Sequence, residues 1–189
     1  MKTCATIVLI AALFTSPAGA AVIWDEGMNG DLGTDPLIPT PLALSLGGNT
    51  VIGTVSNVAG TDRDYITFTI PPFHVLSSLN LLVFTPNNLG FAAFNSGSTG
   101  FVPSAATNAL FLSGIHPSAA DVGMDLMPFF VNRAVTTNAL PSPELGPGTY
   151  CFIIQQTSAI TQSYSLEFVM QGSVPTETKT WSSIKALYQ

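Results

Sequence analysis

The sequence predicts an all-β protein, an antiparallel jelly-roll β-sandwich of about eight strands. The clearest observation lies in residues 64–70, where Ile66, Phe68 and Ile70 alternate with Tyr65 and threonines. Such a period of two is typical of a strand with one buried face. Two prolines follow and end the run, because proline cannot donate a hydrogen bond to a β-ladder. The second observation is that similar short segments recur between Gly-, Pro- and Asn-rich turns, without the helical periods of βαβ units.

The expected strands follow one another along the chain as short apolar alternations. They cover residues 42–46, 50–56, 64–70, 75–84, 90–94, 109–113, 149–156 and 163–170. The last two are separated by a short polar stretch, which predicts a closing hairpin. Residues 121–132 show the least β-like pattern and predict a short helical turn under a long loop.

The first twenty residues have the layout of a secretory signal peptide. Lys2 gives a positive start, residues 5–14 are apolar, and an Ala-Gly-Ala sequence ends at Ala20. The apolar stretch is shorter than the ~20 residues that a spanning helix needs. We therefore expect cleavage near Ala20, no transmembrane segment in the mature chain, and a secreted or cell-envelope location.

The mature chain is long enough for one domain with a hydrophobic core. Residues 21–41 are rich in Gly, Pro and Asp and predict an irregular lead-in that crosses the edge of the sandwich. The β-sandwich itself is expected over residues 42–171. Residues 172–189 form a tail whose last part has apolar residues at helical spacing. It is either an unstructured end or a short helix that serves as a sorting or docking peptide.

The charge of the chain excludes some partners. The loss of Lys2 with the signal changes the formal net charge from −6 to −7, and Arg63 and Arg133 are the only basic residues before the tail. Binding of nucleic acid requires clustered Lys and Arg, so that function is excluded. Anionic membrane surfaces are disfavoured for the same reason.

The residues that usually carry catalysis are few and isolated. Cys151 is the single cysteine of the mature chain and lies in an apolar strand pattern, which predicts a buried, inert thiol. His74 and His116 lack the spacing of a zinc site. The sequence has no nucleophile elbow, Walker or dinucleotide-binding pattern. A non-enzyme is therefore expected, although paired carboxylates of a hydrolase would meet only in three dimensions.

Oxygen ligands gather in the lead-in and recur just before residue 65. The candidate calcium ligands are Asp25, Glu26, Asn29, Asp31, Asp62 and Asp64. Hard cations such as calcium take six to eight oxygens, often from loops of this composition. The spacing is not that of an EF-hand, because Gly27 stands at the third position and Pro36 replaces the bidentate Glu. Asx turns are the alternative explanation of the same residues. A structural calcium is the only cofactor that the sequence suggests.

Several motifs together resemble a known family. They are residues 25–26 (DE), 29–32 (NGDL), 48–55 (GNTVIGTV), 62–71 (DRDYITFTIP), 123–128 (GMDLMP) and 145–150 (LGPGTY). This set is similar to bacterial secreted pre-peptidase C-terminal-like domains, which occur alone, beside exported enzymes, and in exoproteins with a Pro-Glu-Pro C-terminal sorting signal. The resemblance spans residues 25–170 and implies a jelly roll without catalytic machinery. Residues 174–177 (VPTE) depart from the sorting signal, because no apolar segment or basic cluster follows.

Three functions are compatible with these observations. The leading hypothesis is an exported, non-catalytic module for extracellular binding or matrix association, with polysaccharide as a candidate partner because Trp24 and Trp181 could stack on sugars. The second is a structural or accessory envelope protein whose C-terminal tail docks on a cell-surface component. A secreted hydrolase is the third.

Overall fold

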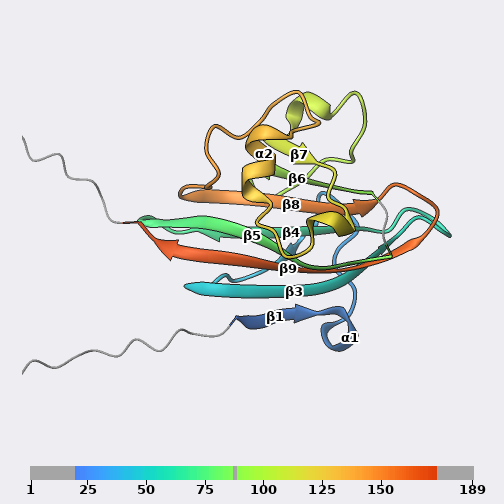
Figure 1. Cartoon of the computed structure of the whole chain (residues 1–189), viewed down its shortest axis with the longest axis horizontal. Coiled ribbons are helices and arrows are strands. Elements are labelled where there is room, and N and C mark those ends of the chain that lie inside the picture. The colour runs from blue at the N-terminus through green and yellow to red at the C-terminus, as the bar shows by residue number, and fades with distance from the viewer. Residues whose placement is uncertain (1–19, 87–88, 174–189) are drawn as a thin grey trace, which may run out of the picture.

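A computed structural model describes residues 20–86 and 89–173 as two β-sheets packed face to face (Figure 1). The first sheet has the order β1 (Ala21–Asp25), β3 (Gly47–Ser56), β9 (Thr161–Gly172) and β5 (His74–Thr85). The second has the order β2 (Thr40–Pro41), β4 (Arg63–Ile70), β8 (Gly148–Gln156), β6 (Gly90–Ser96) and β7 (Ser113–Ile115). The predicted all-β sandwich is confirmed.

The connections give the sandwich its jelly-roll character. The chain passes from one sheet to the other between β3 and β4, β4 and β5, β5 and β6, and β8 and β9. All pairings among β3 to β9 are antiparallel. The short strands β1 and β2 instead pair in parallel with β3 and β4. The lead-in thus supplies an edge strand to each sheet, which its irregular sequence did not predict.

Three strand predictions are wrong, and two of them concern the hairpin and the first strand. The segments 149–156 and 163–170 form β8 and β9, but these strands lie in different sheets and make no hairpin. On β9 both edges are already occupied, one by β3 and the other by β5. Residues 42–46 form no strand: Leu42 is buried beside Thr67, whereas Leu46 is 59% exposed. An alternation of leucines does not make a strand where no neighbouring strand continues the ladder.

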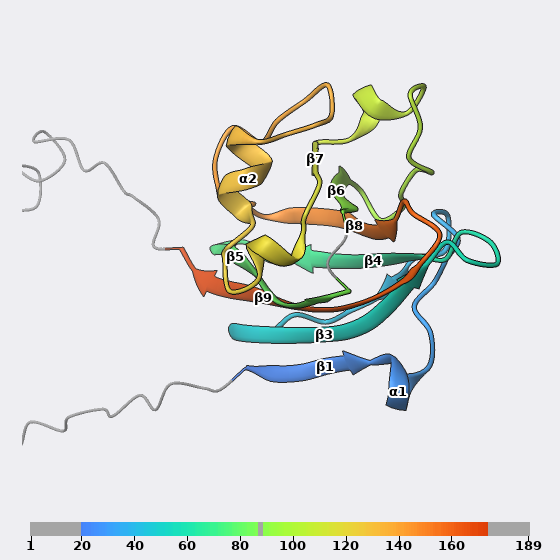
Figure 2. The ribbon, with the colours of Figure 1, turned by 45° about the vertical axis from the view of Figure 1, so that its right-hand side comes forward.

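The remaining elements are short helices. The predicted helical turn in residues 121–132 is confirmed by α2 (Met127–Asn132), which follows the 3₁₀ turn η2 (Ala119–Asp121). The segment expected as a strand at 109–113 instead begins within η1 (Asn108–Leu110) and ends where β7 starts. Helix α2 and the long loops gather beside β6, β7 and β8, whereas β1 and α1 (Glu26–Asn29) lie at the opposite side, next to β3 (Figure 2).

The main core fills the space between the sheets. Its aromatic centre is formed by Phe68, Phe94, Phe152 and Phe168, and the rings of Phe152 and Phe168 meet edge to face across the sheets at 5.5 Å. A second, smaller cluster on the outer side of β6 and β8 includes Cys151, which is fully buried. Burial raises the pKa of its thiol to about 12, in agreement with the predicted inert cysteine.

Parts of the sequence predictions fall outside the described residues. The signal peptide lies almost wholly in residues 1–19, and most of the tail lies in residues 174–189. Within the part of the chain that the structure describes, no helix is long and apolar enough to cross a membrane.

Candidate metal centre

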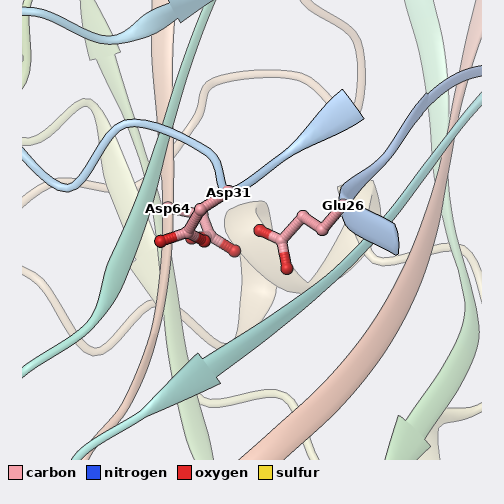
Figure 3. Close-up of side chains that lie close together, drawn as sticks. All are labelled: Glu26, Asp31 and Asp64. Atoms are coloured by element: carbon pink, nitrogen blue, oxygen red, sulfur yellow. The ribbon is translucent and has the colours of Figure 1, made fainter. Parts of the chain in front are cut away.

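Three carboxyl groups from separate segments converge at one end of the sandwich. Each of Glu26, Asp31 and Asp64 offers an oxygen atom, and these oxygens all lie within 4.8 Å of one another (Figure 3). We call these residues the acid cluster. Glu26 begins α1, Asp31 lies in the loop that follows it, and Asp64 is the second residue of β4. The cluster thus joins the lead-in to the body of the sandwich.

The position of Glu26 is fixed by its own hydrogen bonds. One carboxylate oxygen accepts hydrogen bonds from the backbone amide of Thr54 on β3 at 2.7 Å and from its hydroxyl at 3.1 Å. The other oxygen accepts one from the amide of Leu32 at 3.3 Å. Burial raises the pKa of Glu26, although the bonds from Thr54 and Leu32 oppose this shift and the charge of Asp31 adds to it. The carboxylate is therefore held facing the other two acids.

Asp64 is the most deeply buried member. Its exposed fraction is 0%, because it shares the inward phase of Ile66 and Phe68 on β4. One carboxyl oxygen accepts a hydrogen bond from the Tyr164 hydroxyl at 2.6 Å, and the other, Oδ1, has no hydrogen-bond partner. Burial raises the pKa of Asp64 to about 9, and the charge of Glu26 contributes in the same direction. Burial thus disfavours the charged form of Asp64 when no cation is bound.

Tyr164 was not among the residues predicted from the sequence. Its hydroxyl reaches Asp64 from β9, in the opposite sheet, and passes over Gly53 of β3. A Cβ atom at Gly53 would lie 2.6 Å from the Tyr164 hydroxyl and 3.1 Å from the Glu26 carboxyl carbon. Gly53 is therefore needed for the close approach of these two side chains. The inward phase of Asp64 was the available sequence signal for a polar partner in the core.

The other predicted ligands have different positions. Asp62 lies beside the cluster: burial raises its pKa, the charge of Asp31 adds to the shift, and its buried Oδ1 has no hydrogen-bond partner. Asp25 and Asn29 instead build the α1 turn. The Asp25 carboxylate accepts a hydrogen bond from the Gly27 amide, and the Asn29 side chain accepts one from the Asp25 amide, both at 2.9 Å. Asp25 is the N-cap of α1 and Asn29 is its last residue, and the structure does not bring them into the acid cluster.

The acid cluster has no positive neighbour in the described residues. Among residues 20–86 and 89–173, the only Lys or Arg side chains are those of two arginines. Arg63 donates to the Gln155 side chain at 2.7 Å, and Arg133 pairs with Asp121 at 3.3 Å. Carboxylate oxygens at this spacing are the ligands that calcium prefers, whereas zinc and copper sites use His or Cys. The donor set fits a hard divalent cation.

An open pocket of about 520 Å³ lies next to Glu26. It is lined by Asp25, Glu26, Gly27, Ile52, Gly53, Thr54, Val83, Ser163, Tyr164 and Ser165. These residues come from α1 and the end of β1 on one side and from β3, β9 and β5 on the other. The pocket thus combines the apolar side chains of Ile52 and Val83 with hydroxyl-bearing residues and with the two acids Asp25 and Glu26.

Among residues 20–86 and 89–173, no Trp or Tyr side chain is exposed enough to stack on a sugar. Tyr65 and Tyr164 are buried, while Trp24 and Tyr150 are half-buried. The indole of Trp24 donates a hydrogen bond to the Gly30 carbonyl and packs against the main core. Trp24 therefore has a structural role, and the predicted partner Trp181 lies outside the described residues.

Comparison with known proteins gives no family assignment. No family model matches the chain, and no curated protein matches it. Among solved structures, it is similar to PliG of Salmonella Typhimurium, a periplasmic inhibitor of g-type lysozyme, at 12% identity and a TM-score of 0.35. That alignment covers 71% of this chain and 100% of PliG. A likeness at this TM-score carries no conclusion about fold or function.

Proposed function

We propose that this protein is an exported, non-catalytic jelly-roll module that binds one calcium ion at the acid cluster and serves extracellular binding or matrix association. The calcium would join Glu26 and Asp31 of the lead-in to Asp64 of the sandwich. The proposal includes membership of the pre-peptidase C-terminal-like family. Two of the motifs that carry this resemblance, NGDL and DRDY, contribute Asp31 and Asp64.

The observation that carries the proposal is the unpartnered Oδ1 atom of Asp64. A buried carboxyl oxygen without a hydrogen bond is costly, and a buried carboxylate without a counter-charge is more so. Two arrangements relieve this cost: a proton on Asp64, or a cation between Asp64 and its neighbours. The convergence of Glu26 and Asp31 on the same point favours the cation, because a proton on Asp64 leaves the other two carboxylates repelling each other.

Calcium fits better than magnesium for a reason of geometry. The three acids come from a short helix, a loop and a strand, and Asp62 can add a further oxygen from the preceding loop. Calcium accepts six to eight oxygens in irregular arrangements, whereas magnesium requires a near-ideal octahedron. A site assembled from such different segments suits the more tolerant ion.

The same geometry argues against a hydrolase. A catalytic acid must reach the substrate, but Asp64 is fully buried and its Oδ2 is engaged by Tyr164. Both oxygens of Glu26 accept hydrogen bonds from the protein itself. Asp64 and Glu26 therefore fit a structural role better than a catalytic one. The alternative of docking through the tail concerns residues 174–189, which lie outside the described part of the chain.

The test is isothermal titration of the mature chain, residues 21–189, with calcium chloride after treatment with a chelator. We expect one ion per chain with a dissociation constant of about 10⁻⁵ to 10⁻³ M. Asp31→Asn should weaken binding about tenfold or more, since it removes one charged ligand from an exposed position. Asp35→Asn is the matched control, because it makes the same charge change in the same loop. The Asn side chain can still accept the hydrogen bond that the Leu37 amide donates to Asp35. Absence of binding heat in the wild type would reject the cation site.

A further inference from the structure

We propose that the pocket beside α1 receives the side chain of a lysine from a basic partner protein. This inference goes beyond the cation site, because it concerns the open pocket that Glu26 also lines and does not require a bound ion. The pocket, of about 520 Å³, is large enough for the side chain of one long residue.

The walls of the pocket suit an aliphatic stem. Ile52 of β3 and Val83 of β5 both line it, and Val83 is 42% exposed although it is a large apolar residue. A lysine buries its four methylene groups along such surfaces while its ammonium group stays at a polar rim. Because the pocket has no exposed aromatic face on which a guanidinium would stack, lysine fits it better than arginine.

The rim of the pocket offers acceptors for an ammonium group. Asp25 is held in place there, because one of its carboxylate oxygens accepts a hydrogen bond from the Gly27 amide at 2.9 Å. Thr54 and Ser163, which both carry hydroxyl groups, line the same depression. An ammonium group has three donors and no acceptor, so a fixed carboxylate together with hydroxyl oxygens can satisfy it. No basic residue lines this pocket.

Charge complementarity indicates that the partner is a basic protein. The four strands of the first sheet contain Asp25 and Glu167 but no Lys or Arg. Both arginines of the described residues belong elsewhere, Arg63 to β4 and Arg133 to the end of α2. Helix α2 contacts β7 and β5, and residues 123–126 bond to Leu79 and Leu81 at the edge of β5. None of these residues lines the pocket. A negative, uncovered surface of this kind attracts a basic surface and gives its lysine a place to insert.

The test is an NMR titration of the ¹⁵N-labelled mature chain with Nα-acetyl-lysine methylamide, with Nα-acetyl-norleucine methylamide as the uncharged control. We expect amide shifts at Ile52, Val83 and Ser165, and binding of the norleucine compound at least about fivefold weaker than that of the lysine compound. Equal binding of the two compounds, or shifts confined to other residues, would overturn the proposal. Tighter binding of 1,4-diaminobutane than of the lysine compound would overturn the assignment to a protein partner.

Two variants sharpen this test. Asp25→Asn should weaken binding of the lysine compound about fivefold and leave the norleucine compound unchanged. Asn is also a good N-cap, so α1 should persist in this variant. Glu144→Gln is the control, because it removes the same charge from an exposed loop that does not line the pocket. An equal effect of both substitutions would refute a specific role of Asp25. The titrations are run once with calcium and once with chelator, and the lysine compound should bind in both. A protein that binds no calcium but still binds the lysine compound would thus reject the cation site alone.

Discussion

Replacement of Asp64 by Asn should stabilise the calcium-free protein and abolish its stabilisation by calcium. In the folded protein the pKa of Asp64 is raised from 3.8 to about 9, mainly by burial. At neutral pH and without a cation, the folded state therefore holds a proton on Asp64 that the unfolded chain releases. Asn carries no charge in either state, so the stability of the variant does not decrease as the unfolded chain releases a proton.

The magnitude follows from the shift. A carboxyl group whose folded pKa is raised contributes fully to stability below the unfolded pKa, and the contribution is lost as the pH rises toward the folded pKa. Each pH unit in this window lowers the free energy of unfolding by about 1.4 kcal/mol. At pH 7, about three units above 3.8, the loss amounts to about 4 kcal/mol relative to acid conditions. That is the upper limit of what Asp64→Asn regains, because Asn must still share the site with the Tyr164 hydroxyl.

The assay is urea unfolding of the wild type and of Asp64→Asn at pH 5, 7 and 8, each with chelator and with calcium. With chelator, the wild type should lose stability between pH 5 and 8, and the variant should lose much less. With calcium, the difference between the two proteins should shrink at pH 8 by about the calcium stabilisation, because only the wild type gains the ion. Parallel pH profiles of the two proteins with chelator would refute the reasoning, since they would show that Asp64 is not the titrating group.

The remaining predictions concern calcium binding, Gly53 and Cys151. Calcium at 10 mM, about 100 times a dissociation constant of 10⁻⁴ M, should stabilise the wild type by about 2.7 kcal/mol and raise its melting temperature by about 5–11 °C, with no such rise in Asp31→Asn. Gly53→Ala should destabilise the protein by about 1–3 kcal/mol in urea unfolding, because the new Cβ would collide with the Tyr164 hydroxyl. Cys151, whose burial raises the thiol pKa to about 12, should react with a thiol reagent only after denaturation; fast labelling of the native protein would contradict its burial.

The sequence identified most strands but could not assign them to sheets. The alternation in residues 64–70 and the apolar run around Phe152 both correspond to strands, because inward side chains recur with a period of two. The same period describes a strand in either sheet, so β8 and β9 were expected to pair although they lie in opposite sheets. Strand partners depend on which edges are free in three dimensions, and a local pattern does not contain that information.

The candidate site was predicted in part for a similar reason. Asp and Asn serve both as metal ligands and as caps of turns, and spacing alone does not separate the two roles. Asp25 and Asn29 satisfy backbone amides of the α1 turn, whereas Glu26 and Asp31 project toward Asp64. Asp64 differs from the others in its place on the strand. It occupies an inward-facing position of β4, and the next inward-facing positions hold apolar residues. An acid in an apolar phase is the sequence signal that most directly indicated the site.

The lead-in is where calcium should have its largest local effect. Strand β1 joins β3 through four residue pairs with an irregularity between Val22 and Trp24, and β2 joins β4 through only two. These are short ladders at sheet edges. The contacts of Glu26 with Thr54 and the acid cluster therefore add to the attachment of the lead-in, beside the buried Leu32 and the bond from the Tyr65 amide to the Gly33 carbonyl. Without a cation the cluster repels itself and loosens the same attachment.

Hydrogen exchange can therefore separate local release from global unfolding. Chelation should speed exchange of the β1 amides, which bond to β3, about tenfold or more, while the central amides of β8 and β9 change only as much as global stability does. Asp31→Asn should give the fast β1 exchange even with calcium present, and Asp35→Asn should not. Equal acceleration of β1 and β8 by the chelator would show that the ion stabilises the whole sandwich uniformly, and the acid cluster would then not be the joint between the lead-in and the second sheet.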